Sequence, residues 1–245
     1  MTEPVVYGLH AVRKLLQLNP ERARRLRVSN KRNKRLDQLV VLASKQGVEV
    51  ETVDRDELDR LAGSDRHQGC VLELSEVATP SLNLQQALQD IGPESLFLVL
   101  DGVTDPHNLG ACLRSADAAG VKAVIVPKDR AVGLTPVVRK VAAGAAESVP
   151  LIEVTNLSRA LQQLQQAGVW IVGTTGEAET SLYDQNFSGA LALVMGAEGE
   201  GMRRLTAEHC DFLVKLPMLG QVESLNVSVA TGICLYELNR QRKVW

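Results

Sequence analysis

The apolar positions of the chain fall into two kinds of pattern, and these predict two structural units. Up to about residue 75, short apolar runs alternate with segments whose apolar residues recur at the spacing of one helix face. From Ser95 onward, the expected strands are nearly continuous apolar runs separated by helical segments. Such strands are buried on both faces, which is typical of a mainly parallel sheet covered by helices. We therefore expect an α/β protein with a small N-terminal unit and a larger, mostly parallel C-terminal unit.

The boundaries of the elements follow from the same pattern. In the first unit we expect strands at residues 5–7, 26–29, 48–53 and 69–74, and helices near 11–18, 34–46 and 55–61. In the second unit we expect strands at 96–100, 122–126, 149–154, 169–173, 191–195 and 212–216. The stretch from Ser75 to Asn83 lacks periodicity and contains Pro80, as linkers do. The expected organisation is a first domain at residues 1–75, a linker at 76–90 and a second domain at 91–245.

Charge is unevenly distributed, although the whole chain has a formal net charge of only −2. Residues 1–75 contain 14 Lys and Arg against 11 Asp and Glu, whereas residues 76–245 contain 13 against 18. The run from Arg22 to Arg35 holds eight basic residues and no acidic one. One interpretation is a solvated helix–strand edge. The other is a surface for an anionic partner, nucleic acid above all, because uncompensated cations repel one another.

The nucleic-acid interpretation assigns contacts to Arg24, Arg25, Arg27 and Arg32. Aromatic residues make up only 3% of the chain, which argues against base-stacking platforms of the single-strand-binding kind. We therefore expect any contact through this run to be with the phosphate backbone.

Cysteine usage and hydropathy restrict the compartment. Cys70, Cys112, Cys210 and Cys234 lie far apart, and metal-ligand spacing is absent. We expect buried free thiols in a reducing compartment rather than disulfides, and no metal.

No apolar stretch reaches membrane-spanning length, and the first residues have no signal-peptide pattern. The expectation is a cytoplasmic protein without a membrane partner.

Two loops that follow apolar strands near the C-terminus carry unusual residues. Residues 190–195 lead into Gly196-Ala-Glu-Gly-Glu-Gly201, and residues 212–216 lead through Pro217-Met218 to Ser224-Leu-Asn-Val-Ser228. Loops at strand ends in α/β sheets are common small-molecule sites. The glycine loop has neither the dinucleotide-binding spacing nor the P-loop spacing, and its carboxylates Glu198 and Glu200 would repel a polyphosphate. It suits a neutral or cationic cofactor better, although simple turns would also use these glycines.

A third block follows the first strand of the second unit and runs from Asp101 to Gly120. Asn108 is placed to cap the helix that follows, and Arg114 falls among small residues within that helix. A helix cap and a surface salt bridge are the plain interpretations of these two residues. The small neighbours of Arg114 would, however, let another backbone or subunit approach it closely.

Taken together, the three blocks resemble the signature motifs of the SpoU-type RNA ribose 2′-O-methyltransferases of the SPOUT superfamily. The motifs are D-x-x-x-D-P-x-N-x-G-x-x-x-R-x-A at 101–116, M-G-x-E-G-x-G-M at 195–202 and P-M-x(5)-S-L-N-V-S-x-A at 217–230. The resemblance covers roughly residues 91–245. It implies a SPOUT fold with a deep trefoil knot in the last third of the chain, which composition and periodicity do not show. The first unit, with Tyr7-Gly-Leu-His-Ala-Val12 and His67-Gln-Gly69, looks like the small L30e-like RNA-binding domain of part of that family.

Within the family, the chain is most similar to bacterial enzymes that methylate a guanosine in the peptidyl-transferase P-loop of 23S rRNA. The resemblance therefore implies methyl transfer from S-adenosyl-L-methionine to that ribose 2′-OH, in naked 23S rRNA or in a pre-50S particle. A tRNA ribose 2′-O-methyltransferase of the same fold is the alternative, although those relatives more often carry terminal helical extensions than a separate N-terminal domain.

Two further classes fit less well. A catalytically silent RNA-binding protein should lack one of Asn108, Arg114, Glu198 or Asn226, and this chain has all four. A Rossmann dehydrogenase needs a G-x-G-x-x-G after its first strand, which residues 101–109 do not provide.

The resemblance also assigns the residues of the site. Backbone around Thr174, Gly196, Leu216, Met218 and Leu225 would hold the cofactor, whose sulfonium cation and uncharged adenosine suit an acidic glycine loop. The implied catalytic residues are Arg114, Asn108, Glu198, Asn226 and Ser224.

Each catalytic residue has an expected role. Asn108 and Asn226 would orient the ribose and Arg114, Glu198 would position Asn226 and the arginine, and Ser224 would contact the substrate. The family assigns the arginine that matches Arg114 to activation of the hydroxyl. Because a guanidinium has a pKa above about 12, we expect a clamp on the neighbouring phosphate and the developing alkoxide, with proton abstraction as the alternative.

The last helix is expected at residues 226–240. Val229, Ile233 and Tyr236 recur at helical spacing, with the small residues Ala230 and Gly232 beside them. This pattern fits a core helix or a close-packed subunit contact equally well. Members of the family pair through this region, so the resemblance implies a homodimer in which Arg114 of one subunit approaches the cofactor of the other.

Overall fold

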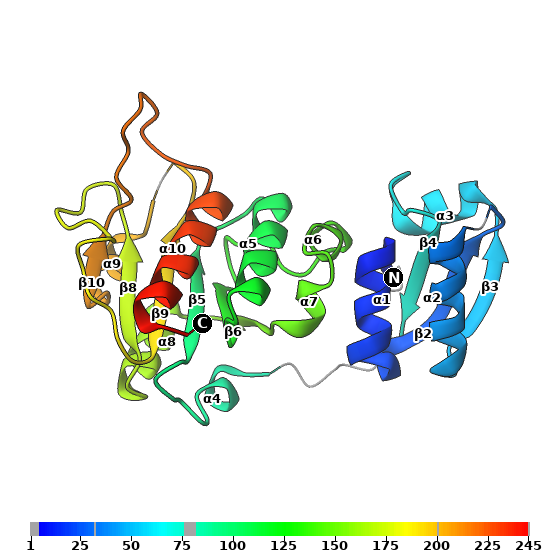
Figure 1. Ribbon diagram of the computed structural model, residues 1–245, viewed down its shortest axis with the longest axis horizontal. Coiled ribbons are helices and arrows are strands. Elements are labelled where there is room, and N and C mark those ends of the chain that lie inside the picture. The colour runs from blue at the N-terminus through cyan, green and yellow to red at the C-terminus, as the bar shows by residue number, and fades with distance from the viewer. Residues whose placement is uncertain (1–4, 32, 76–81, 200, 245) are drawn as a thin grey trace. The chain divides into compact units, whose positions relative to one another are not determined.

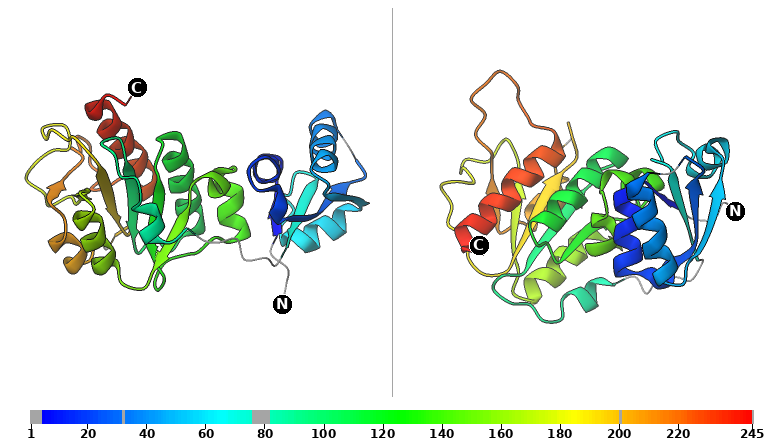
Figure 2. Two further views of the ribbon diagram at one scale, coloured as in Figure 1. Left: turned by 90° about the horizontal axis from the view of Figure 1, so that it is seen from below. Right: turned by 45° about the vertical axis from the view of Figure 1, so that its right-hand side comes forward.

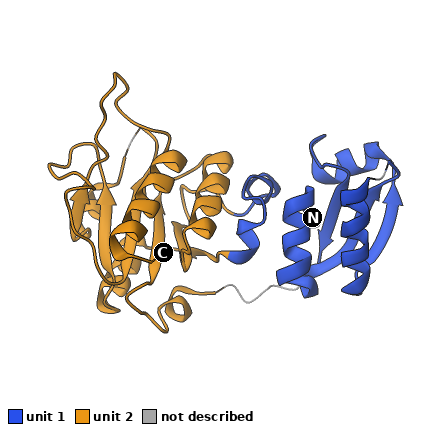
Figure 3. Cartoon of the chain, viewed as in Figure 1, with its two compact units in different colours: residues 1–80, 134–148 blue, residues 81–133, 149–245 orange. Residues whose placement is uncertain are grey.

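The computed structural model describes residues 5–31, 33–75, 82–199 and 201–244. The chain divides into two compact units (Figure 3). The first comprises residues 1–80 together with 134–148, and the second comprises residues 81–133 and 149–245. The first unit therefore includes a short segment from within the range that the sequence analysis gave to the second domain.

The first unit is built on a four-stranded sheet with the strand order β1-β4-β2-β3. The central strand β4 is antiparallel to both β1 and β2, and β3 is parallel to β2. The three strands β1, β2 and β3 therefore all run in the same direction. The four strands are β1 (Val5–Tyr7), β2 (Ala23–Ser29), β3 (Glu49–Val53) and β4 (Cys70–Leu74).

Helices cover both faces of this sheet. On one face, α1 and α2 bury leucines such as Leu15 and Leu39 against Leu26 and Leu72 of the strands. On the other face, Leu58 of α3 packs in a smaller core. The first two helices are amphipathic because their leucines recur at helical spacing. The helices of this unit are α1 (Leu9–Leu18), the 3-10 turn η1 (Pro20–Arg22), α2 (Lys34–Lys45), α3 (Arg55–Ala62), α6 (Pro136–Val141) and α7 (Ala145–Ser148).

A buried carboxylate ties the segment 134–148 into the first unit. The side chain of Glu147 is only 1% exposed. Its carboxylate pairs with Arg22, at an Oε2–Nη1 distance of 2.8 Å, and with Arg139. Two guanidinium groups thus compensate one buried charge, which would be costly if left alone.

The second unit contains a six-stranded, wholly parallel sheet with the order β10-β8-β9-β5-β6-β7. The two views of Figure 2 show helices on both sides of it. Phe97 and Val99 point into a core with α4 and α8, while the alternate residue Leu98 is buried on the opposite side, where α5 and α10 pack together. The strands are β5 (Leu96–Asp101), β6 (Ala123–Pro127), β7 (Leu151–Val154), β8 (Trp170–Thr174), β9 (Leu191–Gly196) and β10 (Phe212–Val214).

Three helices of the second unit, α5, α8 and α9, connect parallel strands, whereas α4 precedes β5 and α10 follows β10 (Figure 1). The helices of this unit are α4 (Leu84–Ala87), α5 (Pro106–Ala118), α8 (Leu157–Gln166), α9 (Arg204–Glu208) and α10 (Val227–Arg242). The α/β class, the ten expected strands and the parallel C-terminal sheet are confirmed. The trefoil knot stays a prediction.

Two local expectations were wrong. Asp105, not Asn108, caps α5, because its carboxylate accepts the backbone N–H groups of His107 and Asn108. Within the expected linker, residues 76–81 lie outside the described part of the chain, but Asn83 and Gln86 form a capping box that starts α4. Leu84 and Ala87 then pack in the core of the second unit.

Three of the four cysteines are buried, as expected from the sequence. All four are free thiols; Cys70, Cys112 and Cys234 are buried and Cys210 is partly buried. Burial raises the pKa of the Cys70, Cys210 and Cys234 thiols to about 12, and that of Cys112 to about 11.

Among the described residues, no group of His, Cys, Asp and Glu side chains could hold a metal ion. In the same residues, every helix is too short or too polar to cross a membrane.

Candidate active site at the carboxyl ends of the parallel strands

The motif residues meet because four neighbouring strands run in parallel. Thr174 ends β8, Gly196 ends β9 and Asp101 ends β5, and these strands are adjacent in the sheet. The register pairs Asp101 with Gly196, and on the other side Thr174 with Val214 of β10. All four strand ends therefore lie at one edge, where ligands bind in open α/β sheets.

The glycine loop closes on itself as a tight hairpin. Ala197 and Gly201 exchange two backbone hydrogen bonds, of 3.0 and 2.9 Å. Gly199 and Gly201 have φ values of +83° and +69°, which side-chain-bearing residues rarely adopt. A Cβ added at Gly196 would overlap with the backbone of Gly201 and Met202. Gly196 is thus required by the loop itself, as the turn interpretation of these glycines allowed. Glu200 lies outside the described residues.

A buried carboxylate anchors this hairpin to the first motif. Asp101, 1% exposed, accepts the backbone N–H of Arg203 at 3.0 Å and its Nε–H at 2.6 Å. The Nη2 group of Arg203 also pairs with Asp101. No role was expected for either residue from the sequence. An acidic residue that ends a fully apolar strand is the signal that would have identified Asp101, because an unpaired carboxylate is costly there.

Three of the expected catalytic side chains form a chain of hydrogen bonds. The Nδ2 group of Asn226 donates to Oδ1 of Asn108 at 2.8 Å, and Nδ2 of Asn108 donates to Oε2 of Glu198 at 3.1 Å. We expected Glu198 to position Asn226 and Arg114. In the structure it holds Asn108, and Asn108 in turn holds Asn226. Asn226 has a second role, because its Oδ1 accepts the N–H of Ser228 and caps α10.

Arg114 stands apart from this chain of hydrogen bonds. It lies six positions after Asn108 on α5, which places it about 9 Å further along the helix and on a different face. Its side chain is exposed, and within the described residues it has no hydrogen bond or ion pair. The salt-bridge interpretation therefore has no support in the described parts of the chain, and a single subunit does not bring Arg114 to the other three residues.

The remaining site residues lie between β10 and α10. Figure 1 shows this connection projecting beyond the sheet edge. Leu216, Met218 and Leu225 are partly buried, whereas Ser224 is exposed. At the base of the connection, the N–H of Thr175 donates to the carbonyl of Val214 at 3.0 Å.

The surroundings of the strand ends fit S-adenosylmethionine. The residues expected around it contribute backbone groups, one hydroxyl and partly buried apolar side chains, without a cation. The nearby Glu198 carboxylate would favour a sulfonium over a phosphate. The Thr174 hydroxyl already donates to the carbonyl of Val194 at 3.2 Å, so it braces two strands and leaves ligand contacts to the backbone.

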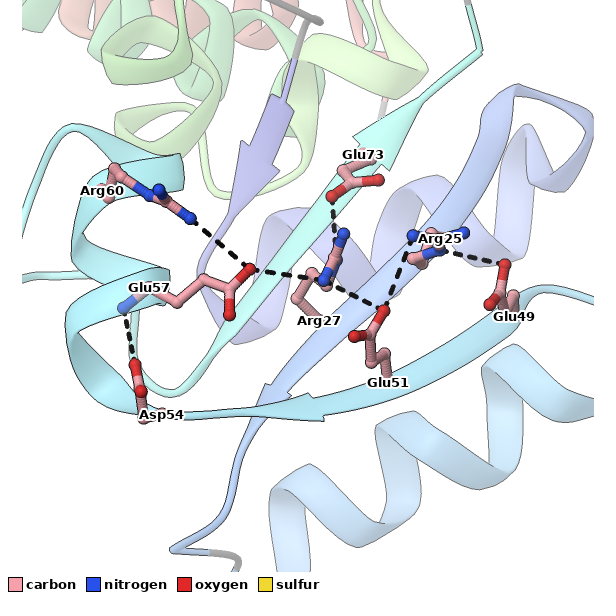
Figure 4. A network of polar contacts seen from close by, with 8 residues as sticks. All are labelled: Arg25, Arg27, Glu49, Glu51, Asp54, Glu57, Arg60 and Glu73. Carbon is pink, nitrogen blue, oxygen red and sulfur yellow. Dashed lines mark hydrogen bonds and ion pairs between the residues drawn. The ribbon is translucent and has the colours of Figure 1, made fainter.

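The basic run of the first unit is compensated in three dimensions. Arg25 pairs with Glu49 at 2.9 Å, and Arg27 pairs with Glu73 at 2.9 Å and with Glu51 at 3.0 Å (Figure 4). The hydrogen bond to Glu49 raises the pKa of the Arg25 guanidinium. The expectation that this run lacks compensating carboxylates was wrong, because the acids come from β3, β4 and α3. Arg24 also has a partner, and Arg32 lies outside the described residues.

Comparisons with known proteins match both parts of the chain. The family model described as the SpoU rRNA Methylase family matches residues 95–236. A second model, for RNA 2′-O ribose methyltransferase substrate binding, matches residues 5–80.

Individual relatives cover nearly the whole chain. The 23S rRNA (guanosine-2′-O-)-methyltransferase RlmB of Pseudomonas putida is 57% identical over 241 residues, covering 98% of this chain and 97% of its own. The enzyme of the same name from Escherichia coli K12 is 54% identical and covers 97% and 98%. An AdoMet-bound rRNA methyltransferase from Sinorhizobium meliloti has a similar structure, with a TM-score of 0.78 at 25% identity, over 98% of this chain and 87% of that one.

These matches agree with the geometry of the strand-end site. The family model spans the parallel sheet, the glycine hairpin, the chain of hydrogen bonds at Asn108 and most of α10. The protein described here is a member of the SpoU rRNA methylase family.

Proposed function

We propose that the protein transfers a methyl group from S-adenosyl-L-methionine to the ribose 2′-OH of a guanosine in 23S rRNA. The observation that carries the proposal is the strand-end site, where Asn108, Asn226 and Glu198 are hydrogen-bonded beside the glycine hairpin. The relatives that are more than half identical to this chain are named for this reaction. The peptidyl-transferase P-loop as target, and a tRNA as the alternative substrate, remain the expectations of the sequence analysis.

The bound cofactor would supply an electrophilic methyl group on its sulfonium. Backbone around Thr174, Gly196, Leu216, Met218 and Leu225 would hold it at the strand ends.

The residues of the chain would mainly position the ribose. Asn226 and Asn108 present amide groups fixed by their mutual hydrogen bond, so the ribose meets donors and acceptors that are already oriented. Glu198 holds the second amide in place. Arg114 would clamp the adjacent phosphate and stabilise the alkoxide as the hydroxyl passes its proton to solvent. Ser224 would contact the substrate.

The site requires a second copy of the chain in this proposal. Within one subunit, Arg114 lies on another face of α5 from Asn108. Helix α10, which packs on α5, buries Thr231 and Leu235 but leaves Val229, Ile233 and Tyr236 at 50%, 36% and 49% exposure. This apolar stripe fits a homodimer contact that brings Arg114 to the partner's cofactor. We further propose that the protein acts on rRNA in the cytoplasm. The trefoil knot that the family resemblance implies is also part of the proposal.

The test is methyl transfer by the purified protein with labelled S-adenosylmethionine and three RNAs: a 23S rRNA transcript, 50S assembly intermediates and bulk tRNA. The proposal expects a single ribose-methylated guanosine in 23S rRNA, mapped by its block to reverse transcription at low nucleotide concentration. Methylation of tRNA alone would move the assignment to the alternative substrate. Binding of the cofactor without transfer to any of the three RNAs would contradict the proposal.

A further inference from the structure

The first unit contains a groove that no part of the proposed active site uses. It is shallow and open to solvent, has a volume of about 530 Å³, and is lined by Leu9, Asn33, Lys34, Arg35 and Gln68. These residues come from three separate stretches of the chain. Two of the five are cations, and none carries a carboxylate.

The topology of the sheet explains why these stretches meet. Because β1 and β2 run parallel and β4 runs antiparallel between them, the ends of β1 and β2 and the beginning of β4 share one edge. Leu9 follows β1, Lys34 follows β2 and Gln68 precedes β4. Gln68, held at a φ of +55°, accepts the N–H of Leu9 with its Oε1 at 3.0 Å and so fixes one wall of the groove.

The two cations of the groove do not stabilise the helix that carries them. Lys34 and Arg35 occupy the first turn of α2, after the cap Asn33. The helix dipole there favours the negative charge of Asp37, which lies in the same turn, and not the two cations. Both side chains are exposed, and neither has an ion-pair partner among the described residues. Exposed cations at this end of a helix weaken it slightly unless an anion binds there.

The surface formed by β2, β3, β4 and α3 of the same unit, here called the acidic sheet surface, has the opposite charge balance. There Arg25, Arg27 and Arg60 lie among Glu49, Glu51, Asp54, Glu57 and Glu73, as Figure 4 shows. Five carboxylates surround three guanidinium groups, so this surface would repel a polyanion. The groove is therefore the better place for an anionic ligand. The nucleic-acid interpretation of the sequence had instead assigned the contacts to Arg24, Arg25, Arg27 and Arg32.

We propose that the groove binds the phosphodiester backbone of the RNA substrate, with Lys34 and Arg35 as the phosphate contacts. The inference rests on the proposed function for the identity of the RNA. The groove reads no base by itself, because its lining offers no aromatic platform and the Asn33 side chain is already used as the cap of α2. Its role is to hold the RNA while the second unit acts on one ribose.

The experiment compares the wild type with Lys34→Gln/Arg35→Gln and with the control Lys45→Gln/Arg60→Gln. Both variants lose two positive charges from exposed positions of the first unit. Lys45 is at the opposite end of the same helix, and Arg60 belongs to the acidic sheet surface. The measurements are binding of a 23S rRNA fragment at several KCl concentrations, methyl-transfer kinetics on that fragment, and S-adenosylmethionine affinity.

The groove variant should show a higher KM for RNA and a salt slope smaller by about 1.4 to 1.8, because each lost phosphate contact removes about 0.7 to 0.9. The control should keep the wild-type slope, and cofactor affinity should be the same in all three proteins. Equal salt slopes in the groove variant and the control would overturn the inference about the groove. The proposed function would still stand in that case if the wild-type protein methylates the rRNA. Failure of the wild type to methylate rRNA would instead contradict the proposed function.

Discussion

Asp101 and Arg203 are 102 residues apart in sequence, yet the Asp101 carboxylate holds both the backbone N–H and the guanidinium of Arg203. This contact joins the end of β5 to the second residue after the glycine hairpin. It holds the hairpin against the end of β5, next to the strand ends where we propose that the cofactor binds.

Replacing Asp101 with Asn should therefore loosen the hairpin. Asn keeps the shape but removes the charge, and we expect a loss of about 1 to 3 kcal/mol in the free energy of unfolding. Denaturant unfolding and calorimetric titration with S-adenosylmethionine would measure stability and affinity, and affinity should fall. Glu208→Gln, which breaks the exposed Arg204–Glu208 pair, is the control and should change little. Unaltered cofactor affinity in Asp101→Asn would show that the pair serves stability alone.

Gly196→Ala should abolish cofactor binding through the hairpin. The new Cβ would overlap with the backbone of Gly201 and Met202, so the loop must open, at a cost of about 1 to 3 kcal/mol or more. Gly92→Ala is the matched control, because a Cβ there meets no atom within 4 Å. Calorimetry on both variants makes the comparison. A Gly196→Ala protein that binds the cofactor normally would mean that the loop relaxes freely.

Arg114→Ala and Asn226→Ala should each reduce methyl transfer by about two to four orders of magnitude, while cofactor affinity stays within a few fold. Arg114→Lys should restore little, because an ammonium cannot reproduce a planar, two-pronged donor. Single-turnover transfer and cofactor titration separate the two effects. Since Asn226 also caps α10, its variant needs an unfolding curve beside the rate. Near-full activity of Arg114→Lys would favour a simple charge role.

The shared site predicts complementation between two inactive subunits. Mixing Arg114→Ala chains with Gly196→Val chains should restore about half of the sites in a mixed dimer, because one of its two sites receives both intact parts. No recovery of activity, or a fully active monomer, would contradict the shared site.

The exposed stripe of α10 offers a second measurement of the same dimer. Ile233→Asp should give a monomer in light scattering, since a carboxylate in an apolar contact is costly. Val41→Asp, at an exposed apolar position on α2, should leave the assembly unchanged. A dimer that survives Ile233→Asp would move the contact elsewhere.

The arginines of β2 should matter for stability. The Glu73 side chain is only 7% exposed, and Arg27 is its ion-pair partner. Arg27→Met should cost about 3 kcal/mol in the free energy of unfolding, because it leaves a buried carboxylate uncompensated. Lys45→Gln should cost almost nothing. For this reason, a variant that replaces all the arginines of the run at once would confuse lost folding with lost RNA binding.

The sequence by itself determined the secondary structure and the chemistry of the motifs. Apolar runs such as 96–100 and 191–195 predicted buried parallel strands, because only strands covered on both faces are apolar throughout. The order and spacing of the three motifs indicated the family, which the family models confirm. The apolar runs and the motifs can both be read from residues that are close together in the sequence.

Only the tertiary structure decided which residues contact one another. Charge compensation of Arg25 and Arg27 depends on Glu49, Glu51, Glu57 and Glu73, which reach β2 through sheet pairing and the packing of α3. In the same way, the Asp101–Arg203 contact and the groove at Lys34 depend on which strand ends share an edge. Electrostatic and hydrogen-bond energies depend on distances in space, and a linear pattern of residues does not contain those distances.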